Sequence, residues 1–224
     1  MVGTYSPLSG MPPIKVQYNE AIGDYLVRHL RQDAVMERVA AETAQMPNAM
    51  MMSPPDEAAL LTMLARLSGA RRALEVGTFT GYGAIAIARG LADGGRLTCL
   101  ELSEDFASIA RRNLEDAGVL DRVDIVLGPA DESLRSMPEE PTFDYVYLDA
   151  DKTAYPTYYD LLLPRLEPGG LLLIDNVLLR GAVLDPQDDR ARTIDDLNNR
   201  ITTDDRVDSV MVLVADGLTL VRKR

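Results

Sequence analysis

The stretch ALEVGTFTGYGAIAIA (73–88) begins with an apolar run, continues into a glycine-containing turn and ends in a helical pattern. The apolar run predicts a strand at 72–77, and the residues after the turn predict a helix at 82–92. Gly77 and Gly81 allow the backbone to turn tightly between the two. A strand followed by a short turn and a helix is the first half of a βαβ unit.

The same alternation continues along the chain. Further strands are predicted at 96–102, 122–128, 143–150 and 170–176, separated by helices at 105–118, 131–137 and 155–166. Repeated βα units predict a parallel sheet with right-handed crossovers and helices on both faces. The tail 207–224 holds two strand-like runs joined at Asp216-Gly217, which is a strong hairpin signal. We therefore expect an α/β fold whose mostly parallel sheet ends in an antiparallel hairpin.

The segment before the first strand has a different character. Residues 1–17 are rich in Pro, Gly and Ser and predict a loose arm, and helical patterns follow at 19–32 and 33–45. Asp56 then begins an amphipathic helix. Its apolar side is expected to hold Leu60, Leu61, Leu64 and Leu67.

At 224 residues the chain suits one domain spanning 1–224, although length alone would also allow two small ones. Within it we expect an arm and helices at 1–55, forming a lid or dimer region, ahead of a core at 56–224. The net charge of −12 repels phosphate backbones, and no basic stripe offsets it. We therefore expect no nucleic-acid partner.

The single cysteine, Cys99, cannot form an internal disulfide, which suits a reducing cytosol, and we expect it to be a core thiol. No apolar stretch approaches the ~20 residues needed to cross a bilayer, and the N-terminus lacks a signal-peptide pattern. The sequence therefore predicts a cytoplasmic protein with no membrane partner. The only histidine, His29, has no evident catalytic partner, and we expect it to be structural or on the surface.

Ligands of open parallel sheets bind beyond the carboxyl ends of the strands, which directs attention to the first turn. The spacing of Gly77, Gly81 and Gly83 is not the G-x-G-x-x-G of dinucleotide sites. Glu75 stands just before the turn, and an acidic side chain there suits a cationic or hydrogen-bond-donating ligand better than a pyrophosphate. A tight turn without a ligand is the alternative.

The next two strand ends favour a nucleoside. Glu101 ends the second strand, at the position where an acidic residue pairs with ribose hydroxyls, although it could equally be a solvated strand end. Ala130 and Asp131 follow the third strand, where they could flank an adenine ring.

Charged and amide side chains follow the fourth and fifth strands. The fourth strand ends at Asp149 and the fifth at Asp175 and Asn176, and neighbouring parallel strands end side by side. Two carboxylates and an amide oxygen, without His or Cys, suit Mg²⁺, with Ca²⁺ or Mn²⁺ as alternatives. The competing hypothesis is that Asp149 caps the following helix and that Asp175 is only a solvent-exposed residue of a loop.

Five motifs in the same order and spacing resemble the small cation-dependent class I O-methyltransferases of the catechol and caffeoyl-coenzyme A group. They are LEVGTFTGYGAIAIA, CLELSEDFASIARRN, GPADE, FDYVYLDADKTAYPTYYD and GGLLLIDNVLLRG. The resemblance covers about residue 35 to the C-terminus. It implies a doubly wound, Rossmann-like, seven-stranded sheet with an antiparallel last strand, and S-adenosylmethionine as the methyl donor.

The resemblance also implies how the donor is held. Glu75, Gly77 and Gly83 would contact its methionine end, Glu101 the ribose and Ala130 the adenine side. Relatives often carry Ser where Gly83 stands, so that contact is expected through the backbone. The full set of expected donor-binding residues is Met51, Glu75, Gly77, Thr78, Phe79, Gly83, Glu101, Leu102, Ala130, Asp149 and Tyr158.

For the chemistry, the resemblance implies a metal on Asp149, Asp175 and Asn176 and a catalytic Lys152, with Asp151 not a ligand. Two adjacent phenolic hydroxyls can chelate a cation, which lowers the pKa of the bound oxygen. Lys152 would either accept the proton as a general base or stay charged and stabilise the phenolate. Asp149 counts as catalytic because it would hold the ion from the end of the strand.

Other features are assigned less specifically. Tyr155, Tyr158 and Tyr159 follow the metal loop and are expected mainly in core or dimer packing. The stretch 178–200 predicts a loop leading into a helix, with a polar surface segment at 185–192. Loops at this position shape the acceptor pocket in the resembled family.

The sequence thus predicts a divalent-cation-dependent methyltransferase, a homodimer, that acts on a small aromatic acceptor with adjacent hydroxyls. A nucleotide-dependent oxidoreductase and a non-catalytic nucleoside-binding protein on the same fold are the alternatives.

Overall fold

The computed structural model describes residues 19–31 and 33–224, so the predicted arm at 1–17 lies outside the described residues. The chain divides into two units, 1–31 and 32–224. In the first unit, helix α1 (Glu20–Arg28) begins after Asn19, whose side chain accepts a hydrogen bond from the N–H of Ile22. His29 is exposed there, stacked on Tyr25, as expected for a surface residue.

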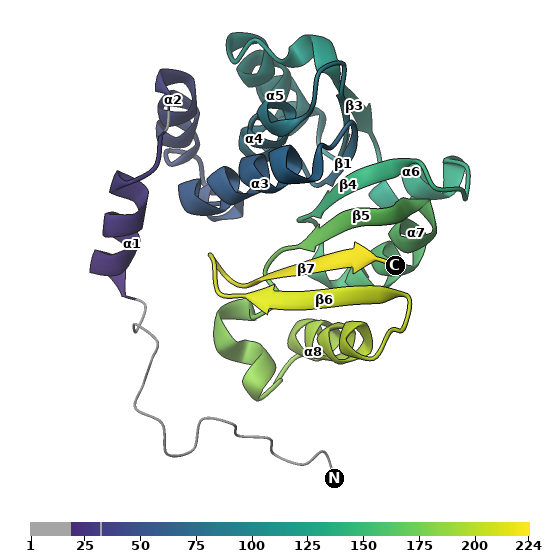
Figure 1. Ribbon diagram of the computed structural model, residues 1–224. Helices are drawn as coiled ribbons and strands as arrows, with labels where there is room; N and C mark the ends of the chain where they lie inside the picture. Colours follow the sequence, from purple (N-terminus) through teal and green to yellow (C-terminus); the bar gives the residue numbers. More distant parts are fainter. Residues whose placement is uncertain (1–18, 32) are drawn as a thin grey trace. The chain divides into compact units, whose positions relative to one another are not determined.

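The second unit holds a seven-stranded sheet in the order β3-β2-β1-β4-β5-β7-β6 (Figure 1). The strands are β1 (Arg72–Val76), β2 (Arg96–Glu101), β3 (Val123–Leu127), β4 (Phe143–Leu148), β5 (Leu166–Ile174), β6 (Val207–Val212) and β7 (Leu218–Lys223). The first five pair in parallel, and β7 lies antiparallel between β5 and β6. The predicted α/β fold with a terminal antiparallel hairpin is confirmed.

Helices cover both faces of this sheet. They are α2 (Ala34–Thr43), α3 (Pro55–Ser68), α4 (Tyr82–Gly90), α5 (Glu104–Asp116), α6 (Ala130–Ser136), α7 (Tyr155–Arg165) and α8 (Asp189–Thr202), with short 3-10 turns η1 (Ala49–Met51), η2 (Leu120–Arg122), η3 (Lys152–Ala154) and η4 (Leu179–Leu184). No described helix is both long and apolar enough to span a bilayer. Helix α8 begins inside the predicted surface segment 185–192, because Asp188 caps it by accepting the N–H of Ala191 at 2.8 Å.

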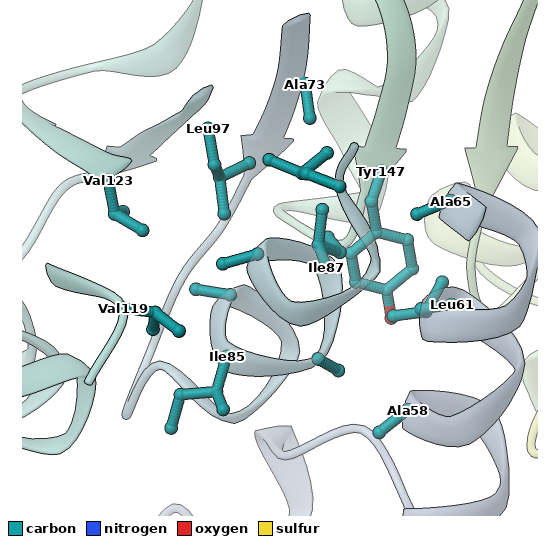
Figure 2. Close-up of a cluster of buried hydrophobic side chains, with 14 of the residues drawn as sticks. Ala58, Leu61, Ala65, Ala73, Ile85, Ile87, Leu97, Val119, Val123 and Tyr147 are labelled. Atoms are coloured by element: carbon teal, nitrogen blue, oxygen red, sulfur yellow. The ribbon is translucent and has the colours of Figure 1, made fainter. Parts of the chain in front are cut away.

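Two buried clusters result from the alternation of side chains along each strand. One joins α2, α3, α4 and α5 to one face of the sheet, and Figure 2 shows its centre, with Ile85 and Ile87 of α4 below Ala73 and Leu97. The other joins α6, α7 and α8 to the opposite face through residues such as Leu74 and Val146. A sheet buried on both faces explains why its strands read as continuous apolar runs.

The apolar side of α3 differs from the prediction at one position. Leu61 is fully buried, but Leu67 is 75% exposed, so Leu67 does not pack with the rest of the predicted apolar side. A Cβ added to Gly90 of α4 would lie 2.7 Å from the Cβ of Ala65, which shows how closely the two helices approach. That close contact lies on the Leu61 and Ala65 side of α3 and leaves Leu67 in solvent.

The backbone ladder continues one residue past the strand ends. The N–H of Gly77 donates to the carbonyl of Leu100, that of Asp149 to Val76, and that of Asp175 to Leu148, at 3.0, 2.9 and 3.1 Å. Three functional candidates on three strands are therefore held next to one another by main-chain hydrogen bonds.

We expect Gly77→Ala to lower the free energy of unfolding by more than about 3 kcal/mol. Gly77 has φ +92°, and a Cβ there would lie 2.0 Å from the carbonyl oxygen of Asp149. Gly69 provides the control, since it also has positive φ but no atom within 4 Å of an added Cβ. Gly69→Ala should cost only about 1 kcal/mol. Urea unfolding compares the two, and equal losses would contradict the steric argument.

Candidate active site at the carboxyl edge of the sheet

A cavity of about 1520 Å³ lies at the edge where the parallel strands end. Typical sites for one small ligand measure about 300–1,000 Å³, so this one has room for two ligands together. Every residue predicted to bind the donor, hold a metal or act in catalysis lines it. These residues are Met51, Glu75, Gly77, Thr78, Phe79, Gly83, Glu101, Leu102, Ala130, Asp149, Lys152, Tyr158, Asp175 and Asn176. The structure brings them together, and their individual roles stay predictions.

Glu75 is a buried carboxyl group that borders this cavity. It is 1% exposed, and burial raises its pKa to about 8. The thiol of Cys99 donates a hydrogen bond to its Oε2 at 3.3 Å, so the expected core thiol also supports the site. A Cβ added to Gly83 would lie 2.6 Å from its Oε1, so a larger residue there would require the Glu75 side chain to shift. A carboxylate in this setting fits the cationic ammonium group of S-adenosylmethionine.

Glu101, which is predicted to bind a ribose, also accepts hydrogen bonds from the loop after β1. Its Oε2 accepts the N–H groups of Thr78 and Phe79 at 3.1 and 2.8 Å, and its Oε1 accepts the N–H of Ser103 at 2.9 Å. A carboxylate offers about four acceptor positions, so about one is left for a ligand hydroxyl. The loop contacts were not foreseen from the sequence, because they connect residues more than 20 positions apart.

Apolar side chains surround the same end of the cavity. Phe79 and Phe106 lie edge to face with their ring centres 4.8 Å apart. Leu102 and Met51 are 74% and 50% exposed and lie at the rim. Tyr158 is nearly buried yet lines the cavity, whereas Tyr155 and Tyr159 are wholly buried in the core.

A charged cluster occupies the ends of β4 and β5. The ammonium group of Lys152 pairs with Oδ1 of Asp149 and lies 5.1 Å from the ring centre of Tyr155. Asp175 is 2% exposed and accepts hydrogen bonds from the N–H of Asn176 and the hydroxyl of Tyr147. Burial, followed by the charge of Asp149, raises the pKa of Asp175 to about 7.

The alternative reading of these acids does not hold. Asp151, not Asp149, caps the following turn, since its carboxylate accepts the N–H of Thr153 at 3.2 Å and its hydroxyl at 2.6 Å. Asp175 is not a solvent-exposed loop residue, because its side chain is buried.

A third carboxyl group beside the cluster was missed from the sequence. Glu57, in the first turn of α3, is fully buried, and its pKa is raised to about 10 by burial and then by the charges of Asp175 and Asp149. Acidic residues are common in the first turn of any helix, so nothing in the local pattern distinguishes Glu57.

The cluster fits a hard divalent cation. Asp149 and Asp175 supply carboxylate oxygens, and among the described residues Lys152 is the one cation that pairs with these carboxyl groups. Asn176 has φ +57°, an uncommon conformation that Asn tolerates better than most residues and that often marks functional positions. In the part of the chain that the structure describes, no group of three or more His, Cys, Asp or Glu is arranged as metal ligands. The candidate set has two aspartates and an amide.

Comparison with known proteins shows the family to which the chain belongs. Residues 28–224 match the model of a family described as O-methyltransferase. The chain is 34% identical to "Probable caffeoyl-CoA O-methyltransferase 1" of Dictyostelium discoideum, over 94% of this chain and 95% of that protein. It is 37% identical to "Catechol O-methyltransferase domain-containing protein 1" of Mus musculus, over 88% and 78%. The O-methyltransferase from Bacillus cereus in complex with SAH superposes with a TM-score of 0.84, at 33% identity, over 91% and 97% of the two chains.

We expect Glu75→Gln to weaken the binding of S-adenosylhomocysteine at least about tenfold while leaving the fold intact. Because the pKa of Glu75 is raised from 4.5 to about 8, the folded protein keeps a proton that the unfolded chain loses. That contribution to stability is present below pH 4.5 and is lost as the pH rises through about 8. The unfolding free energy of Glu75→Gln relative to the original chain should therefore increase with pH across this window.

Calorimetry measures the binding, and urea unfolding at pH 5 to 9 measures the stability. Glu104→Gln is the control, since Glu104 lies on the surface in the first turn of α5 and does not line the cavity. Undiminished binding by Glu75→Gln would contradict the assigned contact.

Proposed function

Because the chain belongs to the O-methyltransferase family and is an S-adenosylmethionine-dependent enzyme, we propose that it methylates a small aromatic acceptor with two adjacent hydroxyls and uses a divalent cation. The observation that carries the proposal is the cluster of Asp149, Lys152, Asp175 and Asn176, of which Lys152 and Asp175 are buried, inside a cavity large enough for two ligands.

The order of the strands supports an arrangement with the donor on one side of this cluster and the acceptor on the other. Most of the donor-binding candidates lie at the ends of β1, β2 and β3, on one side of β4 in the sheet. The other cavity walls come from η4, the start of α8 and the turn between β6 and β7, beyond β5. Asp149, at the end of the central β4, lies between them. Holding two reactants in line in this way can contribute roughly 7–11 kcal/mol at best.

Asp149, Asp175 and Asn176 would hold the cation through oxygen atoms, which favours Mg²⁺, with Ca²⁺ or Mn²⁺ as alternatives. A cation bound there would supply a Lewis acid that favours the ionised form of a chelated phenol. Lys152 lies beside Asp149 and is positioned to receive the phenolic proton or to balance the charge of the phenolate. The phenolic oxygen would then form a bond to the donor's methyl carbon while the bond between that methyl carbon and the sulfonium sulfur breaks, and S-adenosylhomocysteine would be the second product.

The two alternatives lose their support. An oxidoreductase would need a dinucleotide site, but the first turn lacks G-x-G-x-x-G, and the matched family is of methyltransferases. A non-catalytic protein would not need the intact charged cluster. Calorimetry with NAD and with S-adenosylhomocysteine separates the first alternative. A homodimer in the cytoplasm stays a prediction, which analytical ultracentrifugation and cell fractionation can test.

We expect removal of divalent cations by a chelator to abolish methyl transfer to a catechol, and Mg²⁺ to restore it. The measurement is transfer of a radiolabelled methyl group from S-adenosylmethionine. Full turnover in excess chelator would overturn the metal role.

Asp149→Asn should lower kcat/KM at least about 100-fold and weaken Mg²⁺ binding measured by calorimetry, because it removes a carboxylate from the end of β4. Asp151→Asn is the matched control two residues away. Its side chain caps η3, and the amide oxygen of asparagine can still accept the N–H of Thr153, so activity and Mg²⁺ affinity should stay within about threefold. Equal effects of the two changes would count against Asp149 as a metal ligand.

A further inference from the structure

The acceptor side of the cavity carries two arginines whose charge is not neutralised. Arg180 lies in η4 and Arg190 in the first turn of α8, and both line the cavity. Between residues 33 and 224, every other lysine or arginine side chain has a hydrogen bond or ion pair with a described residue, whereas these two have none. In a chain of net charge −12, where acids outnumber bases, two unpaired cations in one cavity wall are unexpected.

The acids on this wall are engaged elsewhere. Asp216, in the β6–β7 turn, accepts the backbone N–H of Arg180 at 2.6 Å through Oδ1. Asp188 accepts the N–H of Ala191 at 2.8 Å as the cap of α8. Each carboxylate holds backbone in place through Oδ1, and neither forms an ion pair with Arg180 or Arg190 in the structure.

The backbone that carries Arg180 is held in an unusual conformation. Leu179 and Arg180 have φ +44° and +52°, in the left-handed region that costs about 1 kcal/mol or more for residues other than glycine. The hydrogen bond to Asp216 and those from Val177 and Leu178 to the β6–β7 turn keep this segment in place. Strain of this kind commonly marks a functional position.

We propose that Arg180 and Arg190 bind a carboxylate on the acceptor, so that the preferred substrate is an aromatic acid with two adjacent hydroxyls. The proposal rests on the methyl-transfer function proposed above and adds the second functional group of the acceptor. A guanidinium group matches a carboxylate with two parallel hydrogen bonds and is poorly hydrated compared with an ammonium group. The acidic surface would repel an anionic acceptor at long range, so a local cationic subsite is needed to retain it.

The test compares 3,4-dihydroxybenzoate with its methyl ester, which has the same ring and hydroxyls but no charge. We expect the original enzyme to have a KM at least about tenfold lower for the acid than for the ester. The double variant Arg180→Gln, Arg190→Gln should raise the KM for the acid about tenfold or more and change that for the ester less than about twofold. kcat for the acid should change little, because the contact is made equally before and during the reaction.

Arg192→Gln is the matched control. Arg192 lies two residues from Arg190 on α8, but it pairs with Asp189 and does not line the cavity. It should leave both KM values unchanged. Because all three arginines are exposed, the variants should fold, and their melting temperatures verify this.

Equal KM values for acid and ester, or a double variant that affects both alike, would overturn the anion subsite while leaving methyl transfer intact. If neither compound were methylated, the proposed function would fail instead. The subsite is then decided by calorimetry of 3,4-dihydroxybenzoate binding to enzyme saturated with S-adenosylhomocysteine. Binding at least about tenfold weaker in the double variant supports the subsite, and equal binding overturns it.

Discussion

The site depends on a contact between two backbones. The carbonyl of Asp149 occupies the space in which a side chain at position 77 would begin, and the absence of one allows the ends of β1 and β4 to remain hydrogen-bonded past the last strand residue. This contact places the turn that borders Glu75 directly against the residue that begins the charged cluster. The candidate donor site and the proposed cation site are therefore two parts of one edge, and a shift in either would move the other.

The protein concentrates buried acidic groups at this edge, and each has a different neighbour. Glu75 is supported by a thiol, Glu101 by three backbone N–H groups, and Asp175 by a tyrosine hydroxyl and an N–H. Burying carboxyl groups without enough positive charge raises their pKa and costs stability. Such a cost is expected where the missing charge comes from a ligand, and the function proposed above assigns that charge to the ammonium group of the donor and to a divalent cation. The raised pKa values of Glu75 and Asp175 follow from this arrangement.

The acceptor side is built from segments that have little in common with the parallel sheet. The hairpin of β6 and β7 returns its turn to the end of β5, where Val177 and Leu178 donate hydrogen bonds to it. Asp216 in that turn fixes the left-handed segment at Arg180. The terminal hairpin therefore completes the sheet and also supports the cavity wall that would select the acceptor.

The sequence by itself determined the order of strands and helices, the antiparallel end of the sheet and the residues at each strand end. These depend on short-range patterns, namely apolar runs, turn residues and their spacing. The sequence could not reveal the burial of Glu57 or the hydrogen bonds between Glu101 and the loop after β1. It also could not reveal the exposure of Leu67 or the unpaired state of Arg180 and Arg190. Each of these depends on packing or pairing between segments distant in the chain, and only the folded structure decides which side chains find partners and which stay free.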